Sequence, residues 1–250
     1  RNGNNVMLTN EGKIFLNYAL QIQSLYQDVK FEIAELAKVP TGSFMLGAST
    51  TIAQYLIAPV LAKFYEKFPN TGISLRNGNT ERIEEAILDK SIELGIVEGI
   101  VHRKTLKYTF FTTDELVVIT HKNSFFANLK EINLHQLLTM PIVLRERGSG
   151  TLEAIEDALD KKNIKLNSLN LIMHLGSSES IKSFLEYSNT VSILSMDAVT
   201  KEIERGEIKV IPVSDFAITR TINFVHLQGT PNKLSTIFMQ FVSKFYNQKL

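Results

Sequence analysis

The sequence predicts an α/β protein in which two similar halves follow a long N-terminal helix. From residue 44 onward, apolar runs typical of buried strands alternate with amphipathic runs typical of helices. Such alternation is typical of parallel strands joined by right-handed helical crossovers. The second half repeats the order of the first: strand, hydroxyl-bearing turn, helix. With 250 residues and 44% hydrophobic content, the chain is long enough for two modest domains that each bury a core.

Residues 9–38 are predicted to form one long helix. Thr9 can cap its start, and Pro40 disfavours helix in the residue before it. Nearly thirty residues at about 1.5 Å each give roughly 40 Å, which is longer than a small domain needs. The narrow apolar stripe favours pairing with a partner helix, and a core helix of the main domain is the alternative. The stripe consists of Phe15, Tyr18, Ile22, Leu25, Val29, Ile33 and Leu36.

Three apolar segments of the first half are predicted to be buried strands. They read FMLGAS, GISLRNG and IELGIVEG, and begin at residues 44, 72 and 92. Helices are expected between them, over about residues 52–67 and 80–90. Because proline has no amide hydrogen and clashes with the preceding turn, Pro59 is predicted to kink the first helix.

The second half echoes the first in individual residues. The segment GNTERI, which begins at Gly78, matches GSSESI, which begins at Gly176, at glycine, a hydroxyl, glutamate and isoleucine. Upstream of each lies another hydroxyl-bearing turn, at residues 49–51 in the first half and 149–151 in the second. The matched spacing predicts a repeated architecture.

Composition excludes several classes of protein. Lysine plus arginine, 27, nearly cancels aspartate plus glutamate, 26, so no broad basic field is available to hold nucleic acid. The absence of cysteine removes disulfides, thiolate metal sites and thiol catalysis. No apolar run approaches the roughly 18 residues of a membrane span, and no signal-peptide pattern is present. Because the sequence begins at Arg1, we expect a fragment or a processed product.

The sequence predicts no catalytic residue, metal site or cofactor. RGSGT resembles a nucleophile elbow, but Arg147 stands where that motif needs glycine. Neither a P-loop nor a dinucleotide-binding or zinc-protease motif is present. The five histidines lack metal-ligand spacing.

Four hydroxyl-bearing turns are the strongest candidates for a binding site. Each follows a predicted strand, so all four are expected at carboxyl ends of parallel strands, where open α/β sheets bind ligands. Helix N-termini at that edge offer free N–H donors and partial positive charge to an anion. Capping of the helix is a sufficient alternative for any single turn, but it does not require four turns at matching positions.

Charged residues flank these turns. Arg147 is a candidate clamp for a carboxylate or oxyanion, and a solvated loop arginine is the alternative. Gly148 and Gly150 would let the backbone approach a ligand closely. Glu98 ends a strand at the same edge and would repel a bare anion. It therefore favours either a zwitterionic or hydroxyl-bearing ligand, or a salt bridge to Arg147 that closes the two halves.

Several spaced motifs resemble the LysR-type transcriptional regulators, most closely the CysL-like subgroup. The segment VMLTNEGKIFLNYALQIQ, from Val6, is similar to the end of the family's winged helix-turn-helix and its linker helix. The rest of the chain resembles the family's effector-binding domain along its whole length. The segments that carry this resemblance are GSFMLGASTTIAQYLIAPVLAKFYEKFP, GNTERIEEAILDKSIELGIVEG, VLRERGSGT and LGSSESIKSFLEYSNTVSILS.

The resemblance implies a type 2 periplasmic-binding-protein-like fold: two Rossmann-like subdomains with a double-strand hinge, preceded by a long linker helix. It divides the chain into a winged-helix remnant (1–8), a linker helix (9–42), subdomain I (43–120 and 224–250) and subdomain II (121–223). DELVVITHK and TINFVHLQG stand where the hinge strands should cross. The implied effector-binding residues are Ser49, Thr50, Thr51, Asn79, Thr80, Glu98, Arg147, Ser149, Thr151, Ser177 and Ser178.

The implied function is ligand sensing in a cytoplasmic transcriptional regulator. A small anionic or zwitterionic metabolite would bind between the subdomains of a homodimer or homotetramer. DNA would be bound by a helix-turn-helix domain that is mostly absent from this chain, and no membrane partner is expected. A transporter's solute-binding protein of the same fold is the main alternative, and an enzyme is the third.

Overall fold

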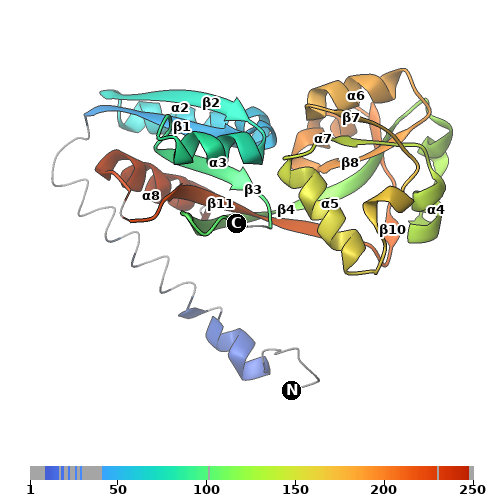
Figure 1. The fold of residues 1–250 in the computed structure, drawn as a ribbon, viewed down its shortest axis with the longest axis horizontal. Helices are drawn as coiled ribbons and strands as arrows, with labels where there is room; N and C mark the ends of the chain where they lie inside the picture. The colour runs from blue at the N-terminus through green and yellow to red at the C-terminus, as the bar shows by residue number, and fades with distance from the viewer. Residues whose placement is uncertain are drawn as a thin grey trace.

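A computed structural model describes residues 9–16, 18–19, 22, 26, 29, 41–100, 102–229 and 231–247. Within them, a nine-stranded sheet runs through two α/β subdomains in the strand order β2-β1-β3-β11-β4-β8-β6-β7, with β9 paired to β4 (Figure 1). The chain has a type 2 periplasmic-binding-protein-like fold, as predicted.

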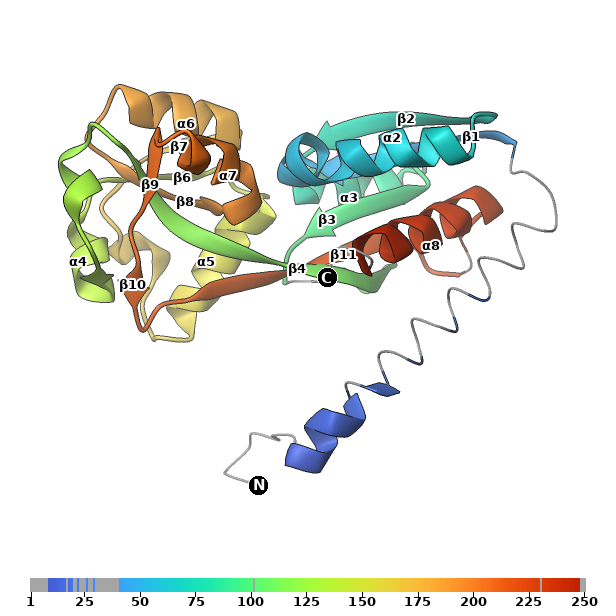
Figure 2. The same cartoon turned by 180° about the vertical axis from the view of Figure 1, so that it is seen from behind.

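Subdomain I contains three parallel strands, and its sheet continues sideways into the two hinge strands. Its helices cover both faces of the sheet, α3 on one and α2 with α8 on the other (Figures 1 and 2). Its elements are β1 (Gly42–Ser49), η1 (Ile52–Leu56), α2 (Ile57–Lys67), β2 (Thr71–Gly78), α3 (Thr80–Leu88), β3 (Leu94–Glu98) and α8 (Lys233–Asn247).

Subdomain II repeats this plan. The parallel strands β6, β7 and β8 are covered by α4 and α5 on one face and by α6 and α7 on the other. Its elements are η2 (Phe125–Asn128), β5 (Ile132–Asn133), α4 (Leu134–Thr139), β6 (Ile142–Arg145), α5 (Gly150–Asp160), η3 (Leu166–Ser168), β7 (Leu171–Leu175), α6 (Ser178–Glu186), β8 (Val191–Ser195), α7 (Met196–Glu204), β9 (Ile208–Val210) and β10 (Val213–Ser214).

Two long antiparallel strands join the subdomains. They are β4 (Leu106–His121) and β11 (Ile218–Leu227); β11 pairs along its whole length with residues 106–116 of β4, with one register shift between Ile222 and Asn223. The two predicted hinge segments lie in these strands. From Leu116 onward β4 pairs with β8 of subdomain II. β11 pairs with β3 of subdomain I, and its Ile218 packs in the core of subdomain II, so both hinge strands reach both subdomains. The predicted boundaries at residues 120 and 223 remain a proposal.

A kink was expected at Pro59, and the structure has a change of helix type just before that residue. The helix starts as a single π-helical turn, η1, and becomes α-helical from Ile57. Pro59 cannot donate to the carbonyl of Tyr55, and its ring crowds that carbonyl, so the preceding turn widens.

Glycines allow α3 to pack closely on the sheet of subdomain I. A Cβ atom on Gly47 of β1 would lie 3.0 Å from Cγ2 of Ile83, and one on Gly95 of β3 would lie 2.8 Å from Cδ1 of Ile87; both isoleucines belong to α3. Only glycine leaves room for this contact. The close packing fixes the N-terminus of α3 at the carboxyl ends of the strands.

The N-terminal helix is described only in part. Residues 10–16 are helical, and several of the stripe's side chains are exposed, among them Phe15 and Ile22. Most of the predicted helix over 9–38, and the predicted winged-helix remnant, lie outside the described residues. Among the helices that the structure describes, none combines the length and apolar character needed to cross a bilayer.

Candidate functional site

The four hydroxyl-bearing turns lie where the two subdomains face each other. They follow β1, β2, β6 and β7, whose carboxyl ends point toward the interface between the subdomains (Figure 1). The second and third turns touch directly. The amide of Glu81 donates to the carbonyl of Gly148 at 3.2 Å, and the side-chain amide of Asn79 donates to the carbonyl of Arg147 at 3.3 Å.

The first turn is buried and bonded to its neighbours. The hydroxyl of Ser49 donates to the Glu98 carboxylate and accepts from the amide of Ile52 at 3.4 Å. The hydroxyl of Thr50 donates to the carbonyl of Gly78 at 3.0 Å, which holds the first two turns side by side. The hydroxyl of Thr51 is buried and has no partner among the described residues.

Three of the predicted residues cap helices. Asn79, Ser149 and Ser177 accept backbone N–H groups at the starts of α3, α5 and α6, as the capping alternative requires. Two further hydroxyls of the turns are buried: Thr80 donates to the carbonyl of Glu98 at 2.7 Å, and Ser178 follows the cap of α6. Capping therefore explains part of the hydroxyl pattern, but it leaves Thr51 unexplained.

The salt-bridge partner proposed for Glu98 was wrong. Glu98 pairs with Arg220 of the hinge strand β11, at 3.1 Å, and not with Arg147. The Arg220 guanidinium is fully buried, lies 2.6 Å from the Asp114 carboxylate and donates to the hydroxyl of Thr151 at 2.8 Å. A single buried cation therefore joins β3, both hinge strands and the start of α5. Arg220 stands between Thr219 and Thr221, at the edge of the segment TINFVHLQG, and nothing local in the sequence indicates its carboxylate partners.

The glycines of the third turn let the backbone approach subdomain I. Gly148 has φ +80°, and a Cβ there would lie 2.5 Å from the carboxylate of Glu81. A Cβ on Gly150 would lie 2.0 Å from the carbonyl oxygen of Glu98. Sequence reasoning assigned these glycines to ligand contact, but the close approach in the structure is between the two subdomains.

A second pair of contacts closes the other side of the interface. The Tyr55 hydroxyl donates to the Glu179 carboxylate at 2.6 Å, and Lys182 lies 5.1 Å from the centre of the Tyr55 ring. Burial and the adjacent Glu179 carboxylate raise the pKa of Tyr55, so this phenol remains a donor. Sequence analysis did not single out these residues, because nothing local distinguishes them from ordinary helix positions.

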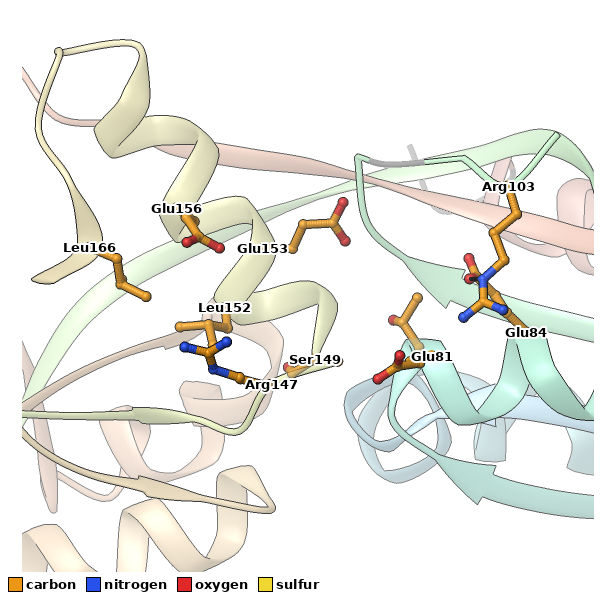
Figure 3. A pocket seen from close by; sticks show the side chains of 11 residues that line it. Glu81, Glu84, Arg103, Arg147, Ser149, Leu152, Glu153, Glu156 and Leu166 are labelled. Atoms are coloured by element: carbon orange, nitrogen blue, oxygen red, sulfur yellow. Dashed lines mark ion pairs between the residues drawn. The ribbon is translucent and has the colours of Figure 1, made fainter.

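A pocket of about 520 Å³ opens between α3 and α5. Glu81, Glu84 and Arg103 of subdomain I line one side of it, and Arg147, Glu153 and Glu156 of subdomain II line the other (Figure 3). Three of the predicted residues line it: Thr80, Arg147 and Ser149. The exposed Arg147 is the charged predicted residue that faces this space, whereas Arg145, two residues earlier, is buried. The remaining lining residues are Gly148, Leu152 and Leu166.

Glu84 carries the most buried carboxylate of this pocket. Burial raises its pKa, while the bonds from Tyr108, at 2.7 Å, and Arg103, at 2.8 Å, lower it; the net direction is upward. A raised pKa means that the Glu84 carboxyl binds its proton more tightly in the folded chain than in the unfolded chain. The free energy of unfolding therefore falls as the pH rises from the pKa of the unfolded chain to the raised pKa of the folded chain.

Replacing Glu84 with glutamine is therefore expected to stabilise the chain at neutral pH and to have no effect in acid. Below about pH 4 the carboxyl is protonated in both states, so the two chains should unfold alike. Above the raised pKa only the native glutamate bears a buried charge. Urea unfolding at both pH values measures the difference, and a variant less stable than the native chain at neutral pH would contradict the assignment.

The part of the chain that the structure describes holds no group of three or more histidine, aspartate or glutamate side chains placed to bind a metal ion. His226 is bonded to the carbonyl of Leu227 at 2.7 Å, and His102 stacks on Tyr108 with ring centres 4.0 Å apart.

The fold and site define a class of protein: two α/β subdomains on a double-strand hinge, with the carboxyl ends of both sheets turned toward each other. Sequence and structure comparisons specify the family. Residues 37–246 match the model of the LysR substrate binding domain. The chain belongs to the LysR family of transcriptional regulators.

Individual relatives agree with this assignment. The chain is 29% identical to a probable RuBisCO transcriptional regulator of Phaeodactylum tricornutum, over 99% of this chain and 82% of that protein. It is 27% identical to the transcriptional regulator CysL of Bacillus subtilis, over 97% and 80%. The regulatory domain of Synechocystis PCC6803 CcmR, solved with 2-PG, superposes with a TM-score of 0.73 at 25% identity, over 82% of this chain and 97% of that one. The effector-binding domain of QuiR, solved with shikimate, has a TM-score of 0.73 at 16% identity, over 84% and 99%.

Proposed function

We propose that this chain senses a small anionic or zwitterionic metabolite, which binds between the two subdomains at the four hydroxyl-bearing turns. The observation that carries the proposal is the meeting of these turns from both subdomains at the ends of their strands, with the buried hydroxyl of Thr51 left without a partner among the described residues. The ligands named with CcmR and QuiR, 2-PG and shikimate, support a small metabolite as the effector. The residues assigned to it are Ser49, Thr50, Thr51, Asn79, Thr80, Glu98, Arg147, Ser149, Thr151, Ser177 and Ser178.

Regulation would follow from a change in the population of hinge angles. An effector that binds one arrangement of the subdomains more tightly shifts the equilibrium toward it, whereas a ligand with equal affinity for all arrangements regulates nothing. The N-terminal helix would pass this geometry to DNA-binding helix-turn-helix domains in a cytoplasmic homodimer or homotetramer. We propose no catalytic activity and no cofactor. The relatives are regulators, which favours this function over a transporter's solute-binding protein.

Replacing Thr50 or Ser149 with a bulky residue, Thr50→Phe or Ser149→Phe, should abolish the response to effector while the chain stays folded. Both hydroxyls are buried at the interface, so a large side chain would occupy the space between the turns. The test measures the rise in melting temperature produced by 2-PG, shikimate and related carboxylates, since a ligand that binds only the native state stabilises it. Ligand stabilisation that is unchanged in both variants would contradict the site.

Removing residues 1–38 should weaken self-association. Exposed apolar side chains of the N-terminal helix, including Phe15 and Ile22, are suited to a second copy of the helix. Sedimentation of the full and the shortened chain measures this, and the same oligomer in both would rule out the helix as the pairing surface.

A further inference from the structure

A buried arginine ends β6 with one donor still open. The Arg145 side chain is 1% exposed. Its Nε and Nη2 donate to the Glu146 carboxylate at 2.9 and 3.2 Å, and Nη2 also lies 3.4 Å from the carbonyl of Gly176. Its Nη1 has no partner among the described residues. A buried polar group is normally paired, so an open guanidinium N–H is available to an oxyanion.

Contacts place this arginine among the four hydroxyl-bearing turns. Arg145 itself precedes the third turn, and its contact to Gly176 reaches the fourth. Its partner Glu146 accepts from the side-chain amide of Asn79, in the second turn, at 3.3 Å. The hydroxyl of Thr50 ties the first turn to the second. The Arg145–Glu146 pair therefore lies between hydroxyl-bearing turns of both subdomains.

The first turn also approaches Arg145 from the side of Tyr55. Tyr55 lies one helical turn beyond Thr51, packs against the cluster that includes Leu175, and is close enough to Arg145 for that positive charge to act on the phenol. Leu175 is the residue that pairs with Arg145 in the sheet. Thr51, whose hydroxyl is unpaired, and Arg145, whose Nη1 is unpaired, thus belong to facing elements of the two subdomains.

Glu146 neutralises Arg145 and is partly exposed to solvent. Its side chain is 28% exposed, whereas that of Arg145 is 1% exposed. An anion that bound beside both residues would place two negative charges on a single buried cation, which is unfavourable unless one of them leaves. The partly exposed Glu146 can turn toward water, and the buried guanidinium cannot.

We propose that Arg145 is the anion-binding arginine of this chain. In the absence of effector, the Glu146 carboxylate occupies the Arg145 guanidinium, and the effector's carboxylate or other oxyanion displaces it on binding. The inference rests on the proposed function and specifies the regulation of the same site. It transfers the role of anion clamp from the exposed Arg147 to Arg145. Displacement of Glu146 would also free Asn79, so anion binding would alter a contact between the subdomains.

The decisive variant is Glu146→Gln, made in the whole 250-residue chain. Glutamine keeps an acceptor for Arg145 but removes the competing charge, so sulfate, inorganic phosphate and acetate should each bind roughly threefold to tenfold more tightly than to the native chain. The melting temperature without these anions should fall, since a buried cation loses its counter-charge. Melting curves across anion concentration, with sodium chloride at equal ionic strength as the reference, give the apparent affinities.

Arg145→Lys and Arg205→Gln form the matched pair of controls. Lysine retains the charge but lacks the planar fork, so Arg145→Lys should weaken anion binding by roughly tenfold. Arg205→Gln removes an exposed charge at the C-terminal end of α7, outside the proposed site, and should change the affinity by less than about twofold.

The outcomes separate this inference from the function on which it rests. Native affinity in Arg145→Lys, or unchanged or weaker binding in Glu146→Gln, would overturn the inference. If anion binding is nevertheless lost in Thr50→Phe and Ser149→Phe, the proposed function would stand with another residue as its clamp. A native chain that none of the three anions stabilises beyond sodium chloride would contradict both.

Discussion

Replacing Arg220 with methionine is expected to lower the free energy of unfolding by about 3–5 kcal/mol, because it leaves buried carboxylates without their cation. Arg220 is fully buried between Glu98 and Asp114, and it also donates to Thr151. These contacts join both hinge strands to the facing ends of the subdomains. The loss should therefore appear in urea unfolding and also in a weaker ligand response.

Arg147→Met is the matched control for this prediction. Its side chain is exposed and faces the pocket, so the same substitution should change stability by less than about 0.5 kcal/mol. Equal losses in the two variants, or a loss below about 1 kcal/mol in Arg220→Met, would show that the hinge network does not stabilise the fold.

Replacing Gly150 with alanine is expected to separate the two subdomains. The added methyl would lie 2.0 Å from the carbonyl oxygen and 2.6 Å from the carbonyl carbon of Glu98, and these backbone atoms cannot turn aside as a side chain would. Overpacking of this kind costs about 1–3 kcal/mol, which corresponds to a melting temperature lower by roughly 2–10 °C. Because α5 must move away from β3, ligand stabilisation should be lost as well.

Gly176→Ala tests whether steric contact is the cause. A Cβ at Gly176 meets no atom within 4 Å, so the variant should unfold within about 0.5 kcal/mol of the native chain. A native melting temperature and native ligand response in Gly150→Ala would mean that the close contact between Gly150 and Glu98 is not needed.

Local patterns explain why the architecture could be predicted. Alternating apolar and amphipathic runs placed the parallel strands and most helix boundaries close to those observed: the helix expected over 80–90 spans Thr80–Leu88. The internal echo, from Gly78 and from Gly176, marked two corresponding strand-to-helix turns, since the residue after each glycine, Asn79 or Ser177, caps the helix that follows. The position of Pro59 predicted a distortion but not its type, because a π turn depends on how the wider helix packs.

The charge network could not be predicted because its members are distant in sequence. Glu98, Asp114 and Arg220 come from three strands, and only the sheet order brings them together. From the sequence, Arg147 was the candidate anion clamp, and Arg145 was not singled out. Arg145, however, is buried at the end of a strand that reaches the interface. Water cannot satisfy its N–H donors there, whereas it can satisfy those of the exposed Arg147.

The most direct test of effector binding between the subdomains is a titration followed by the backbone amide signals of the nitrogen-15-labelled chain in solution. When 2-PG or another stabilising anion is added, the account predicts that the largest shifts fall on the four turns, at residues 49–51, 79–80, 149–151 and 177–178. Largest shifts on the outer helices, with these turns unmoved, would contradict it.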